Sequence, residues 1–353
     1  MINIKDSIIK LPAYEVPQKA RIKLNQNESP YDIPSEDKKE ILRRLKKTNW
    51  NRYPQSEPKK LKSALADYTG HPPNGILVGN GSNELILAIM LATCDKGDEI
   101  TLITPGFAIY PYIGKILNLK INEIPLKDDF SFDVERLVRS SNKSKLIMFA
   151  SPNNPTGTAI EIADIEKIVR QNDCFVVVDE AYYEFHNRTC LKLLNKFKNL
   201  LILRTFSKAF GLAGIRLGYL LGNYKIVKEI SKAKLPFSVG ISQQIIAEYL
   251  LGKKEFVMDT VRKIIYEREN MFKALNKIPG ISSVPSCANF ILFGFKEHSA
   301  NMVFEEFYKK GILVRKFNHQ KLKNMLRVTI GTPEENRTFL ENLIQVIRGG
   351  NNA

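Results

Sequence analysis

Short apolar runs alternate with helical patterns of polar and apolar residues between Leu61 and Leu221. This alternation is typical of strand-helix-strand units built on a largely parallel sheet. Helical stretches include Ser82 to Thr93 and Ile162 to Gln171. The strand-length runs are Ile76 to Val78, Glu99 to Ile103, Leu146 to Phe149, Phe175 to Val178, Leu200 to Leu203 and Leu217 to Leu220. The pattern predicts an α/β fold, with a mostly parallel central sheet in a large domain spanning residues 36–235.

The pattern changes after the loop around Pro236, which predicts a smaller α+β domain over residues 236–353. The elements expected there are helices at Ile241 to Leu251, Glu255 to Asn276 and Ala300 to Lys309, strands at Phe290 to Phe293, Ile312 to Val314 and Leu326 to Ile330, and a terminal helix from Glu334. Residues 1–35 contain four prolines and little periodicity. We therefore expect them to form an extended N-terminal arm.

The composition changes this picture little. With 44% hydrophobic and 25% charged residues, the 353-residue chain resembles an ordinary globular protein rather than a disordered one. Its net charge of +16 raises the alternative of a nucleic-acid partner. However, the densest basic stretch, Lys38 to Lys47, interleaves Ile41, Leu42 and Leu45 at helical spacing. It predicts the solvated face of an amphipathic helix, so we expect phosphorylated small molecules rather than nucleic acid.

Three further features bear on the cellular location of the protein and on the state of its cysteines. The apolar runs are much shorter than the roughly 20 residues of a membrane span, so no membrane segment is expected. Residues 1–10 lack the pattern of a secretory signal, which favours a cytoplasmic protein. The four cysteines lie far apart, without C-x-x-C spacing or a nearby histidine, which indicates reduced thiols and no metal site.

The most informative stretch for chemistry follows the apolar run that ends at Leu203. Its Lys208 is expected beyond the carboxyl end of a sheet strand, where open α/β folds bind ligands. Thr205 and Ser207 precede it closely, and Arg216 follows across a glycine-rich loop. Hydroxyls, loop amides and an arginine suit a phosphate monoester, and the lysine could condense with an aldehyde. Taken alone, the stretch could also be a basic loop with structural glycines.

Two other turns follow buried strands. Asp179 ends one strand, and Tyr182 stands three residues further on. A carboxylate at such a position can keep a pyridinium nitrogen protonated, although it could equally cap a helix or bind magnesium. The turn from Ser151 to Gly157 displays Asn154, whose amide, like the tyrosine hydroxyl, could bind the phenolic oxygen of the same ring.

The loop from Gly79 to Glu84 joins a strand to a helix, and amides at a helix N-terminus can bind phosphate. A dinucleotide-binding interpretation fails, because the third glycine is absent and no acid-ended strand follows about 20 residues later.

In their order, these motifs resemble those of fold-type-I pyridoxal-phosphate enzymes of the histidinol-phosphate aminotransferase family. The resemblance covers nearly the whole chain. It departs at Ser29, where asparagine is usual, and at Gly106, where threonine is more usual. Further segments typical of the family are Leu24 to Pro30, Asn51 to Pro54, Pro285 to Phe290 and Leu326 to Asn336.

For the cofactor, the resemblance implies that Lys208 holds pyridoxal 5'-phosphate as a Schiff base and acts as general base. Asp179 would pair with the ring nitrogen, and Phe107 would stack on the ring. Asn154 and Tyr182 would bind the ring oxygen. The residues implied around the cofactor phosphate are Ser82, Asn83, Thr205, Ser207 and Arg216, together with Tyr53 from the neighbouring subunit of a homodimer.

For the substrate, the resemblance implies roles for Tyr14, Asn27, Arg315 and Arg327. The two arginines suit a donor phosphate and an acceptor carboxylate that use one site in turn, because arginine binds both bidentately. The hypothesis is transamination of L-histidinol phosphate with 2-oxoglutarate, which yields imidazole-acetol phosphate and glutamate in histidine biosynthesis. An aromatic-amino-acid aminotransferase and a threonine-phosphate decarboxylase of the same fold remain alternatives.

Overall fold

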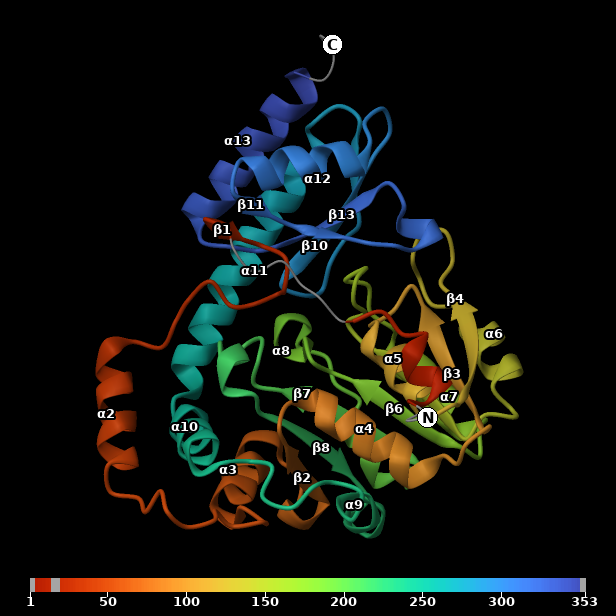
Figure 1. Cartoon of the computed structure of the whole chain (residues 1–353), viewed down its shortest axis with the longest axis vertical. Helices are drawn as coiled ribbons and strands as arrows, with labels where there is room; N and C mark the ends of the chain where they lie inside the picture. The colour runs from red at the N-terminus through yellow and green to blue at the C-terminus, as the bar shows by residue number, and fades with distance from the viewer. Residues whose placement is uncertain (1–3, 14–19, 350–353) are drawn as a thin grey trace.

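A computed structural model describes residues 4–13 and 20–349 of the chain. Its largest sheet has seven strands in the order β2-β8-β7-β6-β5-β3-β4 (Figure 1). Strand β8 is antiparallel to both β2 and β7, and the other neighbours are parallel, which confirms the predicted α/β fold. The strands are β2 (Ile76–Gly79), β3 (Glu99–Thr104), β4 (Lys120–Pro125), β5 (Leu146–Ala150), β6 (Phe175–Asp179), β7 (Leu200–Thr205) and β8 (Gly218–Gly222).

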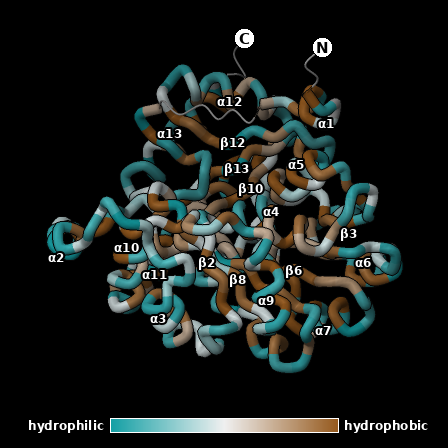
Figure 2. Tube along the Cα trace, turned by 60° about the horizontal axis from the view of Figure 1, so that its bottom comes forward, coloured by the Kyte–Doolittle hydropathy of each residue, from teal (hydrophilic) through white to brown (hydrophobic). Residues whose placement is uncertain are grey.

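Helices cover both faces of this sheet. Along β6, Val177 faces one apolar cluster while Val176 and Val178 face another. Burial on both faces explains why the central strands are continuous apolar runs, which Figure 2 shows in brown inside a more polar periphery. The helices α4 (Ser82–Thr93), α5 (Ile109–Ile116) and α9 (Tyr224–Ser231) contribute to the first cluster, and α6 (Val134–Ser140) and α7 (Ile162–Arg170) to the second.

A second, four-stranded sheet is antiparallel, in the order β12-β13-β10-β9. Its strands are β9 (Ile281–Ser283), β10 (Phe290–Phe295), β12 (Arg315–Lys316) and β13 (Met325–Thr329), and it packs with α12 (Ala300–Lys309), α13 (Pro333–Gly349) and the long α11 (Lys254–Asn276). The helices and strands expected in this region are observed in the expected order, and β9 and β12 were not predicted. The boundary between residues 235 and 236 stays a prediction, and α10 (Ile241–Leu251) packs against α2 (Ser35–Leu45) and α3 (Lys59–Thr69).

One expected strand is shorter than predicted, and one strand of the large sheet was not predicted. The strand expected at Ile312 to Val314 is observed as β11 (Ile312–Leu313), which ends one residue earlier. It pairs in parallel with β1 (Ile22–Lys23), and Val314 separates it from β12. Strand β4 was not predicted, because it lies at the edge of the large sheet and carries polar residues.

The N-terminal segment runs along the smaller sheet. The Leu24 amide donates to the Leu313 carbonyl at 2.8 Å, and the Thr329 amide donates to the Leu24 carbonyl at 2.9 Å. These bonds hold the segment that contains Asn25 and Asn27, both buried, and Asn27 reaches Tyr182, three residues after the end of β6. The remaining short elements are α1 (Asp6–Ile9), α8 (Tyr183–His186), and the 3-10 turns Pro73–Gly75, Leu191–Asn195, Ala213–Ile215 and Gln320–Leu322. No helix of residues 4–13 and 20–349 is long and apolar enough to cross a membrane.

Candidate active site

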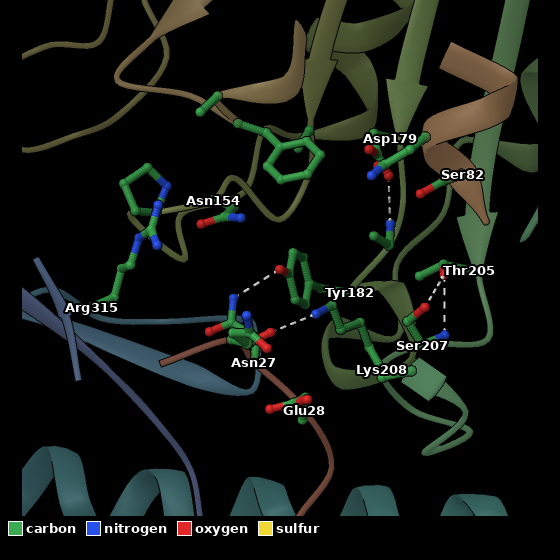
Figure 3. A pocket seen from close by; sticks show the side chains of 18 of the residues that line it. Asn27, Glu28, Ser82, Asn154, Asp179, Tyr182, Thr205, Ser207, Lys208 and Arg315 are labelled. Carbon is green, nitrogen blue, oxygen red and sulfur yellow. Dashed lines mark hydrogen bonds between the residues drawn. The ribbon is translucent and has the colours of Figure 1, made fainter. Parts of the chain in front are cut away.

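A cavity of about 390 Å³ opens at the carboxyl ends of the parallel strands. The N-terminal segment and strands β12 and β13 close it from the other side (Figure 3). Ligand sites of open α/β sheets lie at this edge. The residues expected at the site that line it are Asn27, Ser82, Asn83, Phe107, Asn154, Asp179, Tyr182, Thr205, Ser207, Lys208, Arg216, Arg315 and Arg327. The structure thus brings them together, while their roles toward a ligand stay predictions.

Lys208 follows β7 and lies in the cavity wall. Its Nζ donates a hydrogen bond to the Gln26 carbonyl at 2.8 Å. Burial, and then the positive charge of Arg327, lower the pKa of Lys208 from 10.5 to about 7. A large fraction of this amine is therefore unprotonated at neutral pH, as a nucleophile or general base must be.

Asp179 ends β6 and is 3% exposed. Tyr110 Oη donates to its Oδ2 at 2.7 Å, and the Ala181 amide donates to its Oδ1 at 3.0 Å. Burial raises the pKa of Asp179 to about 6, against the lowering effect of these hydrogen bonds. A carboxylate held at both oxygens has a fixed direction, which suits it to pair with a protonated ring nitrogen.

Tyr110 was not predicted as a site residue. It stands three residues after Phe107, and the two rings meet edge to face at 5.4 Å. Both contribute to the cavity wall. The spacing was a usable signal, because residues three apart at a helix start lie on one side.

An anion cradle lies at the N-terminus of α4. Arg216 Nη1 donates to Ser207 Oγ at 3.2 Å, and the Ser207 amide donates to Thr205 Oγ1 at 3.1 Å. Gly81, with φ +77°, precedes the helix, and a Cβ there would lie 2.6 Å from Arg216 Nη2. Glycine therefore leaves the space in which the guanidinium approaches the helix N-terminus. Helix amides, hydroxyls and this cation together fit a phosphate group.

The side chains expected around the ring oxygen contact substrate-side residues. Asn27 Nδ2 donates to Tyr182 Oη at 2.9 Å. Arg327 Nη1 donates to Asn154 Oδ1, and its Nη2 donates to the Asn25 carbonyl at 2.7 Å. The two expected groups of residues therefore form one hydrogen-bonded wall.

Two arginines face the cavity from the smaller sheet. Arg315 and Arg327 are directly paired in the antiparallel register of β12 and β13. Phe317, two residues after Arg315, also lines the cavity and was not predicted. In Figure 3, Arg315 lies across the cavity from Ser82. This separation allows one anionic group at the arginines and another at the cradle.

Two predicted residues lie elsewhere. Tyr53 is 83% exposed and does not line the cavity of the single chain. Its ring stacks on Phe237 at 4.9 Å. Its reach into a neighbouring subunit stays a prediction. Tyr14 lies outside the described residues.

A buried ion pair lies next to the site and was also missed. Arg204 Nη2 donates to Glu180 Oε2 at 2.8 Å, and both side chains are 2% exposed. Each partner adjoins an expected site residue, Asp179 or Thr205. Because an unpaired buried charge is strongly destabilising, the pair fixes the ends of β6 and β7 relative to each other. Among the residues described, no group of histidine, cysteine, aspartate or glutamate side chains is arranged to hold a metal.

Comparisons with known proteins agree with this geometry. The family model "Aminotransferase class I and II" matches residues 19–343. The chain is 40% identical over 336 residues to a histidinol-phosphate aminotransferase of Clostridium novyi (strain NT), covering 95% of this chain and 93% of that one. It is 38% identical over 350 residues to a protein of the same name from Aquifex aeolicus (strain VF5), covering 98% of each.

A solved structure has the same fold. The crystal structure of histidinol-phosphate aminotransferase from Sinorhizobium meliloti in complex with pyridoxal-5'-phosphate superposes with a TM-score of 0.91 at 23% identity. The match covers 99% of this chain and 98% of the other. The shared architecture therefore extends over both sheets.

Proposed function

Since the chain belongs to the class I and II aminotransferases, and within them to the histidinol-phosphate aminotransferase family, we propose that it transfers the amino group of L-histidinol phosphate to 2-oxoglutarate with pyridoxal 5'-phosphate as cofactor. The products are imidazole-acetol phosphate and glutamate, in histidine biosynthesis. One observation carries the proposal: an amine of lowered pKa, a fixed carboxylate and an anion cradle share one cavity with two arginines.

The residues fit the cofactor. The cradle formed by the α4 N-terminus, Ser207 and Arg216 suits its phosphate, and Gly81 leaves the space that this cradle needs. Asp179 suits its ring nitrogen, and Lys208 suits its aldehyde. When bound, the cofactor supplies an aldehyde for condensation with amines and a pyridinium ring that accepts electron density.

The chain's own side chains transfer protons and position the bound groups. Lys208 Nζ, with a pKa of about 7, can accept a proton at neutral pH and return it. Asp179 keeps its charge oriented through Tyr110 and the Ala181 amide. Phe107, held edge to face against Tyr110, provides an apolar wall above these groups.

The substrates are assigned to the arginine side. Arg315 and Arg327 lie opposite each other in neighbouring strands, so one anionic group can be bound between them. The phosphate of the donor and a carboxylate of the acceptor would occupy this place in turn. An aromatic amino acid also offers a carboxylate, and therefore an aromatic-amino-acid aminotransferase is the second candidate.

A substrate panel tests the assignment. We expect kcat/KM on histidinol phosphate to exceed that on phenylalanine at least tenfold, because a phosphate forms more charge-assisted hydrogen bonds with two arginines than a carboxylate does. The reverse order would favour the aromatic-amino-acid enzyme. Release of carbon dioxide from threonine phosphate, without amino transfer, would favour the decarboxylase.

The proposal includes a homodimer in which Tyr53 reaches the neighbouring site. Large apolar side chains are exposed near it, including Trp50 at 74%, Leu235 at 74% and the stacking partner Phe237 at 43%. Large exposed apolar side chains, when they gather in one patch, are typical of protein interfaces. A cytoplasmic location, expected from the sequence, belongs to the same proposal.

Mixed dimers test the reach of Tyr53. A Tyr53→Ala subunit paired with a Lys208→Ala subunit contains one site with both residues intact, provided that Tyr53 acts on its neighbour. We expect the mixture to regain activity that neither parent has, up to about half per hybrid dimer. No recovery in verified hybrids would mean that Tyr53 does not act across the interface.

A further inference from the structure

Arg315 lies on an edge strand of only two residues. Strand β12 is hydrogen-bonded to β13 alone, and its other side has no strand neighbour in the four-stranded sheet. An edge strand this short is held weakly by its own ladder. The position of Arg315 over the cavity therefore depends on what holds the chain on each side of it. Before it, β11 pairs with β1, and the contacts after it complete the attachment.

The chain after Arg315 is fastened to the large sheet by His319. Its Nε2 lies 3.0 Å from Thr104 Oγ1. Because its Nδ1 accepts a hydrogen bond from the Lys321 amide at 3.2 Å, the proton is assigned to Nε2, which donates to the hydroxyl. Thr104 is the last residue of β3, and Phe107 in the cavity wall follows three residues later.

Two further contacts complete this attachment. Lys321 Nζ donates to the Leu126 carbonyl at 2.7 Å, and the Leu126 amide donates to the Thr104 carbonyl at 2.9 Å. Leu322 is buried in a small apolar cluster, against which Phe317 also packs. Residues 315–322 are thus attached to β13 at one end and to the end of β3 at the other.

We propose that His319 is a positioning residue for substrate binding, which holds the edge strand carrying Arg315 across the cavity from the Phe107 turn. The inference rests on the proposed function, in which Arg315 binds the anionic group of the substrate. It predicts that loss of His319 weakens substrate binding but not cofactor binding. Asp179 ends β6 and Lys208 follows β7 in the large sheet, and the attachment through His319 is made to β3 instead.

The test uses the cofactor-loaded enzyme and inorganic phosphate as a probe of the arginine pair. In His319→Ala we expect phosphate to bind about fivefold more weakly, the size of one neutral hydrogen bond. The KM values for histidinol phosphate and 2-oxoglutarate should rise by a similar factor. The value of kcat should stay within about twofold, and cofactor affinity should not change, because Lys208 and Asp179 are undisturbed.

Rescue separates positioning from general stability. His319→Gln keeps an N–H donor and should restore most of the phosphate affinity, whereas Thr104→Val should match His319→Ala. The double variant His319→Ala/Thr104→Val should be no weaker than either single variant, because both remove the same bond. His298→Ala, in the loop before α12, is the matched control and should behave as wild type.

Hydrogen exchange gives a readout without turnover. Amides of residues 315–322 should exchange faster in His319→Ala than in wild type, and at the wild-type rate in His298→Ala. Unchanged phosphate affinity in His319→Ala, or equal impairment of the glutamine variant, would overturn the inference. If the wild type fails to transaminate histidinol phosphate, the proposed function fails by itself, and phosphate binding still decides the role of His319.

Discussion

Replacing Lys208 by methionine should stabilise the cofactor-free protein while abolishing turnover. Methionine is similar in length and has no charge to desolvate. In the folded chain, burial and Arg327 disfavour the lysine ammonium and lower its pKa from 10.5 to about 7. Since the unfolded chain keeps the ordinary value, Lys208 binds more protons when unfolded between these pH values. Stability from this group therefore rises with pH across that window.

The magnitude follows from the two pKa values. The full difference corresponds to about 5 kcal/mol of destabilisation below pH 7, which falls to about 2 kcal/mol at pH 9 and vanishes well above pH 10.5. Loss of the bond to the Gln26 carbonyl offsets about 1 kcal/mol at every pH. The advantage of Lys208→Met over wild type should thus shrink by about 3 kcal/mol between pH 6 and pH 9.

Urea unfolding of the cofactor-free proteins measures this difference at each pH. Groups that titrate identically in both proteins cancel in the comparison. Lys296→Met, at an exposed lysine, is the matched control and should follow wild type across the range. Parallel stability curves for Lys208→Met and wild type would refute the lowered pKa of Lys208. After addition of cofactor, only wild type and the control should develop the visible absorbance of the lysine-bound form.

Three other changes probe the rest of the site. Tyr110→Phe removes a hydrogen bond that lowers the pKa of Asp179, so the pKa of Asp179 should rise above about 6. Cofactor binding at pH 7, measured by fluorescence, should weaken about tenfold. Unchanged binding would mean that Tyr110 only fills space. Arg327→Ala should raise both substrate KM values at least about 100-fold and leave the cofactor bound, and loss of cofactor instead would reassign the residue. Gly81→Ala should displace Arg216 and weaken cofactor binding at least about tenfold, whereas wild-type affinity would show that the cradle tolerates a side chain.

The sequence predicted the cofactor side of the cavity well because the relevant signals are local. Asp179, Asn154 and Lys208 each follow an apolar run, and parallel strands bring their carboxyl ends to one edge whatever the loop lengths. Their convergence therefore needed no knowledge of distant contacts. Their assigned roles came from the family resemblance and remain open to the experiments above.

The missed features depend on contacts between distant segments. Tyr110 binds Asp179, 69 residues away, and a tyrosine in an apolar helix resembles a core residue. The Arg204 and Glu180 pair could not be recognised, because charged residues in a sequence are normally expected at the surface. The partner of the strand at Ile312–Leu313 could not be predicted either, because β11 pairs with β1, which lies near the other end of the chain.

The cavity lies between two parts of the fold, and mutations can change one part without changing the other. One side, the floor, is formed by the buried seven-stranded sheet, in which Asp179 and Thr205 lie next to the buried ion pair of Glu180 and Arg204. Its roof includes Arg315 on a two-residue edge strand and Phe317 in the loop beyond. Changes in the roof disturb few core contacts. Substrate range can therefore diverge among descendants of such an enzyme, or under laboratory selection, while the chemistry performed on the floor is inherited unchanged.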